Sequence, residues 1–232
     1  VGQDLEIGFK ATRGFTGYIA DFFLDPNTLS AADVADIAAR LYDMSTLDAW
    51  YKLDEGNFPT DNAANSGTSA AGSGAATNVT SKLAMQLATA TPTLYRADFD
   101  ATDDLITIPA HADINDVYPR TVFFSINANS VGEGTFGRIV SKNGSIGEGF
   151  NFYVLDDNGT GCKLGMTNFF DAGNTYQHET TSEVITYGDD CHIVITLVSE
   201  SSTPIVYLNG VAVALTATST TGTTPDLDAA HD

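Results

Sequence analysis

Cysteine and positive charge are both scarce in this chain of 232 residues. Its two cysteines, Cys162 and Cys191, are too few for a disulfide scaffold, and they lack the close spacing of metal-binding pairs. A bridge between them is one interpretation, and two buried thiols are the one we favour. Cysteine usage therefore excludes a small fold held together by disulfides.

The 10 lysines and arginines are outnumbered by 30 aspartates and glutamates, which gives a formal net charge of −20. A surface of that sign repels phosphate backbones and anionic lipid headgroups. Runs of about eighteen apolar residues, the length that a membrane-spanning helix needs, are missing as well. We therefore expect no nucleic acid partner and no membrane insertion. The acidic surface suits solubility and divalent cations.

Histidine is also rare, and its four copies lie at scattered positions: His111, His178, His192 and His231. Their spacing matches neither a catalytic triad nor a zinc site. We expect His192, next to Cys191, to pack at the start of a strand. The histidines thus give no support to catalysis.

Short segments in which apolar and polar residues alternate are abundant. Residues 121–128 show this alternation, and similar segments are separated by turn-forming steps such as Asn143-Gly144 and Asn209-Gly210. Many short strands with regular turns are typical of a β-sandwich. Because 43% of the residues are hydrophobic, one large domain has enough material for its core. We predict an all-β fold.

One short helix is predicted at about residues 30–42. Ser30 can cap its first turn, and Asp33 and Asp36 complement the positive end of the helix dipole. The apolar residues recur with the period of one helix face: Val34, Ile37, Ala38, Leu41 and Tyr42. By contrast, residues 61–92 are rich in Ala, Ser, Thr, Gly and Asn, and we interpret them as a low-complexity surface excursion.

The two ends of the chain look complementary. Residues 204–210 predict a strand that enters an Asn-Gly hairpin, but only about twenty mostly polar residues follow it. Residues 4–8 and 15–24 predict strands without an obvious partner nearby. A sandwich without its last strand would expose an apolar edge and unpaired backbone groups. We therefore predict that residues 4–24 pair within the sheets built by residues 48–215.

Several short motifs also occur in the order known from one family. They are residues 49–56, 61–67, 99–109, 121–127, 192–196 and 207–211, followed in the family's order by residues 5–8, 15–21 and 29–42. With these motifs the chain resembles a laminin G-like domain of the concanavalin A-like lectin/glucanase superfamily over nearly its whole length. The resemblance implies a two-sheet antiparallel jelly-roll sandwich with one short helix.

The family's order places residues 1–43 after Asp232. Residues 1–43 would then be the terminal strands and helix that complete the sandwich, and residues 44–232 would be its main body, with the excursion at 61–92. Closure within one chain and exchange of the segment between neighbouring chains are two possible arrangements. Two truncated neighbouring domains of a longer protein are the third.

Glucanases of this superfamily place paired glutamates around an aspartate on one face of a strand. This chain has no Glu-x-Asp-x-x-Glu spacing, and Glu179 and Glu183 lie four residues apart without the required aspartate. We therefore expect that the protein is not an enzyme.

Oxygen ligands suited to calcium are abundant in the predicted loops, which contain Asp61, Asn65, Asp100, Asp103 and Asp104. Calcium-binding members of the family use the Asp of an Asp-Ser-Gly turn and the Asp of an Ile-Asp-Glu strand. The matching positions here are Asn65 and Ala20, so the second carboxylate is lost. The candidate ligands of a structural calcium ion are Asp61, Asn65, Asp103 and Asp104. Alternatively, Asp103 and Asp104 cap a turn.

A sugar site needs an exposed aromatic ring for the sugar face and amide or carboxylate groups for its hydroxyls. One segment offers both, and its candidate ligand-binding residues are Phe169, Phe170, Asp171, Asn174 and Tyr176. The alternative is that one of the two phenylalanines enters the core and Tyr176 starts a strand.

These features favour a noncatalytic recognition or adhesion module that binds a glycan or a protein at a cell or virion surface. We expect it to be part of a longer extracellular or virion protein, and fold-level resemblance is the basis of that expectation. The alternative is a structural virion protein, a capsid-decorating or tail-fibre element whose residues 1–43 lock adjacent subunits. Neighbouring domains or further copies of the chain are the partners that these hypotheses imply.

Overall fold

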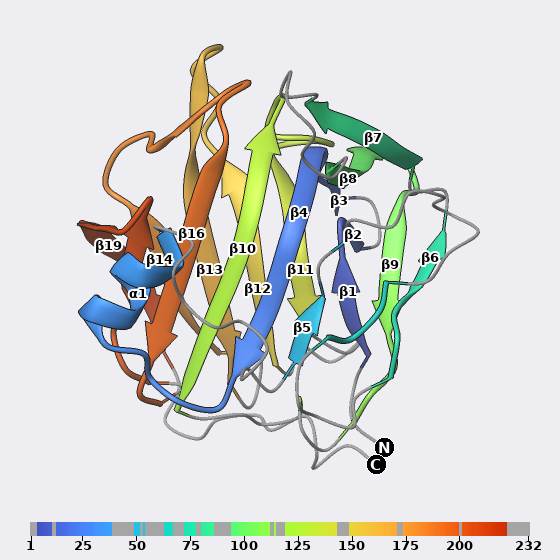
Figure 1. Cartoon of the computed structure of the whole chain (residues 1–232). Coiled ribbons are helices and arrows are strands. Elements are labelled where there is room, and N and C mark those ends of the chain that lie inside the picture. Colours follow the sequence, from blue (N-terminus) through green and yellow to red (C-terminus); the bar gives the residue numbers. More distant parts are fainter. Residues whose placement is uncertain are drawn as a thin grey trace.

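Two β-sheets packed face to face and one short helix make up the fold of the computed structural model (Figure 1). The structure describes residues 4–10, 13–38, 49–51, 53, 63–66, 72–77, 80–85, 94–111, 114, 119–142, 149–170, 174–199 and 201–221. Apart from one parallel bridge between β3 and β11, the pairings of these strands are antiparallel. The predicted all-β sandwich with one short helix is confirmed. The described helix is too short to cross a membrane.

The larger sheet has the strand order β19-β14-β13-β12-β11-β1-β9-β6. In addition, β15 pairs with β13, and the β2–β3 hairpin lies beside β11. The strands of this sheet are β1 (Leu5–Ile7), β2 (Phe9–Lys10), β3 (Arg13–Gly14), β6 (Ala75–Thr77), β9 (Leu105–Ile108), β11 (Phe136–Lys142), β12 (Phe150–Leu155), β13 (Gly161–Phe169), β14 (Thr175–Thr180), β15 (Ile185–Thr186) and β19 (Leu215–Thr220).

The smaller sheet has the strand order β18-β17-β16-β10-β4-β8-β7, and β5 pairs with β4. Its strands are β4 (Thr16–Asp25), β5 (Ala49–Tyr51), β7 (Thr80–Met85), β8 (Leu94–Asp100), β10 (Arg120–Ala128), β16 (Cys191–Leu197), β17 (Ile205–Leu208) and β18 (Val211–Val213).

The amino-terminal strands lie inside both sheets. β1 pairs with β11 and β9, and β4 pairs with β10 and β8. The register sets Phe22 opposite Phe124 and Ile19 opposite Ile126, so apolar side chains of the first strands face the same core as those of the middle of the chain. Residues 4–24 thus pair within the sheets, as the sequence predicted.

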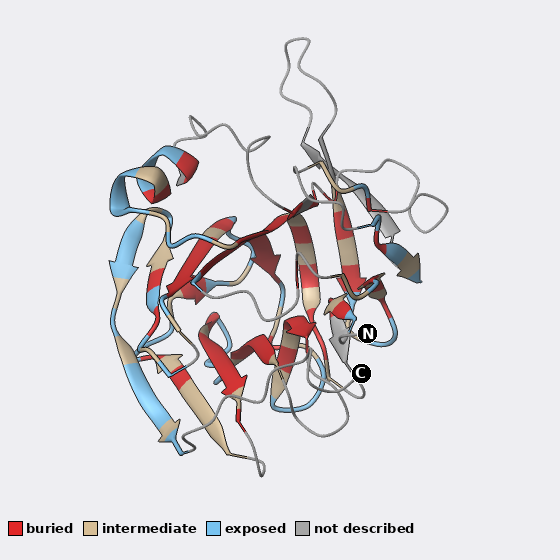
Figure 2. Cartoon of the chain, turned by 90° about the horizontal axis from the view of Figure 1, so that it is seen from below, coloured by how far each residue is buried: buried red, intermediate tan, exposed pale blue. Residues whose placement is uncertain are grey.

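The main core fills the space between the sheets, as the buried positions in Figure 2 show. Strands such as β10 contribute alternate side chains to it, here Val122, Phe124 and Ile126. Burial of such side chains contributes about 1.5–3 kcal/mol each. Cys162 and Cys191 belong to this core as free, buried thiols, which confirms the favoured interpretation.

Helix α1 (Ala31–Ala38) packs on the smaller sheet. The Ser30 hydroxyl accepts the Asp33 N–H at 3.2 Å, and the Asp33 carboxylate accepts the Ser30 N–H at 3.0 Å, so the two residues cap the helix reciprocally. Its apolar side forms a second, smaller core whose buried members are Phe23, Val34, Ile37, Phe123 and Val194. Residues 39–42, the rest of the predicted helix, lie outside the described part.

Residues 61–92, which we interpreted as a surface excursion, contain strands that join both sheets. Within this range β6 pairs with β9, β7 pairs with β8, and Ala63 forms a bridge with Gly74. Strand pairing uses backbone N–H and C=O groups, so a segment poor in apolar side chains can still extend a sheet. The remaining residues of the range lie outside the described part.

Candidate functional site

The outer face of the larger sheet carries aromatic, guanidinium and small polar groups on neighbouring strands. Arg138 of β11 lies opposite Tyr153 of β12, which lies opposite Gly165 of β13. Because Val154 and Leu164 face the core, the side chains next to them in sequence point away from it. We call this surface the aromatic–arginine face and define it by Arg13, Phe136, Arg138, Ser141, Asn151, Tyr153, Thr167 and Phe169.

The rings on this face are packed against one another. The centroids of Phe136 and Tyr153 are 5.1 Å apart, and the Arg13 guanidinium lies 3.7 Å above the Phe136 ring. A Cβ atom at Gly165 would come within 2.3 Å of the Tyr153 ring. Glycine at position 165 therefore lets the tyrosine lie against the backbone of β13.

Small polar groups lie on the same face as the rings. The Ser141 hydroxyl donates to Asn151 Oδ1 at 2.7 Å, and the Thr167 hydroxyl donates to the Tyr153 hydroxyl at 3.4 Å. Ser141, Asn151 and Thr167 are only 1%, 4% and 4% exposed, although their side chains point away from the core between the sheets. These groups are thus held in place by neighbouring side chains instead of being free in water.

Burial also shifts the pKa values of Arg138 and Tyr153 on this face. Burial lowers the pKa of Arg138, the positive charge of Arg13 lowers it further, and Glu6 raises it. Among the described residues the Nε atom of Arg138 has no hydrogen-bond partner. Burial raises the pKa of Tyr153, so the phenol stays neutral. The face therefore presents a guanidinium and a neutral phenol next to aromatic rings.

The predicted sugar-binding residues do not all lie on one side of the larger sheet. Phe169 is half-buried and lies on the aromatic–arginine face, on the same side of β13 as Thr167. Phe170 is 1% exposed and packs on Tyr176 at 5.0 Å, and its N–H donates to the Asn174 carbonyl at 2.8 Å. Phe170 is a buried residue and therefore cannot stack on a sugar. The alternative, that one of the two phenylalanines enters the core, applies to Phe170. Asp171 lies outside the described residues.

The residues of this face that the prediction missed come from separate segments of the chain. Arg13 belongs to β3, Phe136 and Arg138 belong to β11, and Tyr153 belongs to β12. The available signal was the i, i+2 spacing of Phe136 and Arg138 and of Asn151 and Tyr153, which places each pair on one side of its strand. Nothing in that spacing shows that the two strands are neighbours.

A second candidate site is the turn between β8 and β9, which brings Asp100, Asp103 and Asp104 together. One carboxylate oxygen of each lies within 4.8 Å of the others. The Asp104 carboxylate accepts the Asp100 N–H at 2.6 Å, and Asp100 accepts the Thr102 N–H at 2.8 Å. Three carboxylates at a turn are a ligand set that calcium prefers. The same hydrogen bonds also agree with the alternative of a capped turn.

Asp104 is the least exposed of the three acids, at 5%. Burial raises its pKa to about 6, and the negative charges of Asp100 and Asp103 add to this effect, whereas the Asp100 N–H opposes it. Ionisation of Asp104 therefore costs more in the fold than in water, and a nearby positive charge would reduce that cost.

The predicted calcium ligands are only partly brought together. Asp103 and Asp104 share the turn, but Asn65 pairs with Tyr51, which lies beside Phe22 of β4, whereas Asp100 lies beside Thr16. Six residues of a strand span about 20 Å, so Asn65 lies far from the turn. Asp61 lies outside the described residues.

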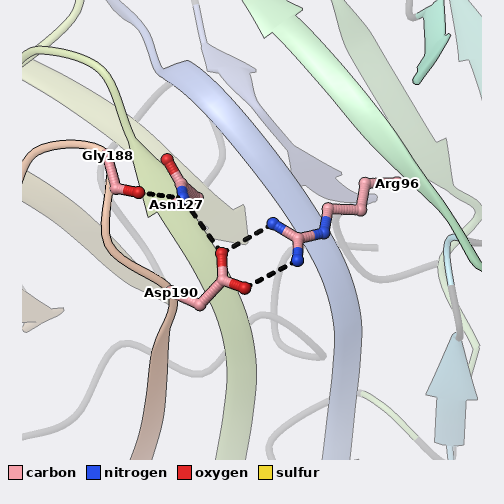
Figure 3. A network of polar contacts seen from close by, with 4 residues as sticks. All are labelled: Arg96, Asn127, Gly188 and Asp190. Atoms are coloured by element: carbon pink, nitrogen blue, oxygen red, sulfur yellow. Dashed lines mark hydrogen bonds and ion pairs between the residues drawn. The ribbon is translucent and has the colours of Figure 1, made fainter. Parts of the chain in front are cut away.

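Arg96, Asn127, Gly188 and Asp190 form a polar network on the smaller sheet (Figure 3). The Arg96 guanidinium binds both carboxylate oxygens of Asp190 at 2.6 Å, and Asn127 donates to Asp190 at 2.9 Å and to the Gly188 carbonyl at 2.7 Å. Because β4 lies between β8 and β10, Arg96 reaches across this strand. The partners satisfy one another, so we assign the network a structural role.

Comparisons with protein-family models, with curated proteins and with solved structures found no match.

Proposed function

We propose that the protein is a noncatalytic recognition module of the laminin G-like type, and that it binds a glycan on the aromatic–arginine face. The supporting observation is the combination of half-buried phenylalanine rings, a buried tyrosine and a half-buried arginine on the outer side of one sheet. Most outer sheet faces are covered instead by solvated, mobile polar side chains.

Each group on this face suits one part of a sugar. The ring of Phe169 can stack on the apolar side of a pyranose, whereas Arg138 and the Tyr153 phenol can bind its hydroxyl or carboxylate oxygens. Hydrogen bonds to a charged group contribute about 1.5–3 kcal/mol each. Since Asn151 and Thr167 are held in place, little side-chain entropy is lost on binding.

Glycan-array binding with the variant Arg138→Gln tests this proposal. We expect affinity to fall roughly tenfold or more, because a charge-assisted hydrogen bond is lost. The matched control is Arg96→Gln, which removes an arginine contact on the smaller sheet and should leave affinity unchanged. Phe169→Ala should weaken binding to a similar degree. Equal affinity of the Arg138 and Arg96 variants, or no glycan binding at all, would contradict the proposal.

We also propose that Asp100, Asp103 and Asp104 bind a structural calcium ion and that the module acts outside a cell or on a virion, where calcium is plentiful. The electrostatic cost of an ionised Asp104 between two acids supports this, because a divalent cation would remove it. Titration with calcium should raise the melting temperature of the chain and should not do so in Asp103→Asn. An unchanged melting temperature of the unmodified chain would reject the ion.

A further inference from the structure

His178 is a histidine that the fold buries almost completely, with 4% of its surface exposed. It lies in β14 opposite Met166 of β13, and Met166 belongs to the core between the sheets, so the imidazole ring points into that core. Its printed ring neighbour is Tyr176, whose centroid is 6.4 Å away. Within the described part of the chain the imidazole makes no hydrogen bond. The fold therefore holds this ring among groups that suit its neutral form.

No carboxylate faces the ring from the described strands around it. The one acidic residue in β13, β14, β16, β17, β18 and β19 is Glu179, which lies opposite Gly165 on the outer side of the larger sheet. The titratable groups on the core side of these strands, of β10 and of the turn after β15 are Arg120, Cys162, Tyr176, Tyr187 and Cys191. Thiols and phenols are neutral at and below pH 7, and the arginine is a cation. None of these groups can balance a positive charge on His178.

The ring of His178 lies one strand from the margin of the larger sheet. Within the described residues β19 pairs with β14 alone, and Figure 1 shows the two strands next to each other on the left. Ala217, the β19 residue opposite His178, is small and exposed, and the register shifts between Gln177 and His178. Detachment of such a marginal strand costs less free energy than unfolding of the whole domain. It would also bring the imidazole into contact with water.

We propose that His178 is a pH-sensitive switch of this margin: when its ring takes up a proton in mildly acidic solution, β19 detaches from β14 and the ring becomes hydrated. A buried charge without a partner is costly, whereas a hydrated imidazolium is not. Burial lowers the pKa of His178 below its ordinary value of 6.5, so the folded form binds the proton less well than the opened form. The closed margin is therefore fully stable above about pH 6.5 and is weakened as the pH falls below that value and through the lower pKa of the fold.

Amide hydrogen exchange of the full chain tests the proposal, measured by mass spectrometry at pH 7.5 and pH 5 and corrected for the intrinsic exchange rate at each pH. We expect the protection of β19 to fall roughly tenfold at pH 5, because each pH unit below the ordinary pKa of an imidazole shifts the opening equilibrium by up to that factor. β12, in the interior of the same sheet, should keep its protection.

His178→Gln should abolish the fall in protection of β19, because its side chain is neutral at both pH values. His178→Met is a second neutral variant, used so that one misfolded protein does not end the test, and protection at pH 7.5 shows that each variant is folded. The matched control is His192→Gln, which replaces a half-buried histidine at the start of β16 and should leave the fall unchanged.

A chain whose β19 keeps its protection at pH 5 would overturn the proposal. So would a fall that persists in both His178 variants, that His192→Gln abolishes, or that is equally large in β12, since the acid would then act elsewhere or on the whole fold. Nuclear magnetic resonance titration of the His178 ring in the unmodified chain gives an independent measurement. A ring that titrates at or above pH 6.5 would contradict the switch, and one that titrates below it together with the loss of β19 protection would support it.

Discussion

Asp104 shows at the scale of one residue how burial links stability to pH. In the unfolded chain its pKa is near the ordinary value of 3.8, and in the folded protein it is about 6. The fold therefore favours the protonated carboxyl group, and this contribution to stability is lost as pH rises from about 4 to about 6.

Asp104→Asn should accordingly stabilise the protein at pH 7 in cation-free buffer, by about 1–3 kcal/mol, because the neutral amide keeps an oxygen for the Asp100 N–H without the cost of ionisation. Urea unfolding at pH 4 and pH 7 measures the effect, which should vanish at pH 4. If calcium binds, the unmodified chain regains its stability in calcium and the variant does not. A variant that is less stable at pH 7 without cations would refute this account.

Gly165 is a second residue whose role is set by its neighbour. Gly165→Ala places a Cβ against the Tyr153 ring and should destabilise the fold by about 1–3 kcal/mol through overpacking. It should also weaken glycan binding, because the ring must move. Gly72→Ala is the control, since a Cβ there meets nothing within 4 Å and its stability should be unchanged or slightly higher. Equal stability of both variants in urea unfolding would count against the tight packing at Tyr153.

At the scale of the elements, the Arg96–Asp190 pair links β8 to the turn before β16 across β4. Its side chains are 23% and 50% exposed, so water competes with the contact. A double-mutant cycle with Arg96→Ala and Asp190→Ala should give a coupling energy of about 0.5–1 kcal/mol. The Arg96 hydrogen bond lowers the pKa of Asp190, so this coupling should disappear as pH falls below the ordinary range of an aspartate. Additive effects of the two substitutions at neutral pH would show that the pair is not coupled.

At the scale of the whole molecule, the fold depends on strands from the start of the chain. β4 lies between β10 and β8, and its loss would divide the smaller sheet and expose its apolar core positions. Residues 44–232 alone should therefore show no cooperative thermal unfolding by circular dichroism. Addition of a peptide of residues 1–43 should restore the transition. A cooperative transition in residues 44–232 alone would mean that the amino-terminal strands are dispensable.

Local patterns in the sequence predicted a good part of this molecule. Alternating residues such as Val122, Phe124 and Ile126 predict a strand with one buried side, and Ser30 with Asp33 predicts the start of the helix. The acidic turn could also be predicted from the sequence, because Asp103 and Asp104 are neighbours in the chain. The sequence also predicted that residues 4–24 pair within the sheets, but its premise was wrong: the carboxy-terminal end does not lack a closing strand, because β18 completes the hairpin with β17 and β19 joins the larger sheet.

The contacts between side chains of different strands depend on the strand register. Alternation places Arg138 and Tyr153 each on one side of a strand, but which strands are neighbours depends on pairings between residues far apart in the chain. Asn65 is another example: its residue type suggested a calcium ligand next to the acidic turn, but the strand register places it far from that turn. The pairing of β6 and β7 could not be predicted either, because it depends on backbone groups more than on apolar side chains. Short-range periodicity thus determined the elements and their buried sides, whereas the tertiary structure decided which side chains meet, because pairing energy arises only once distant strands are aligned.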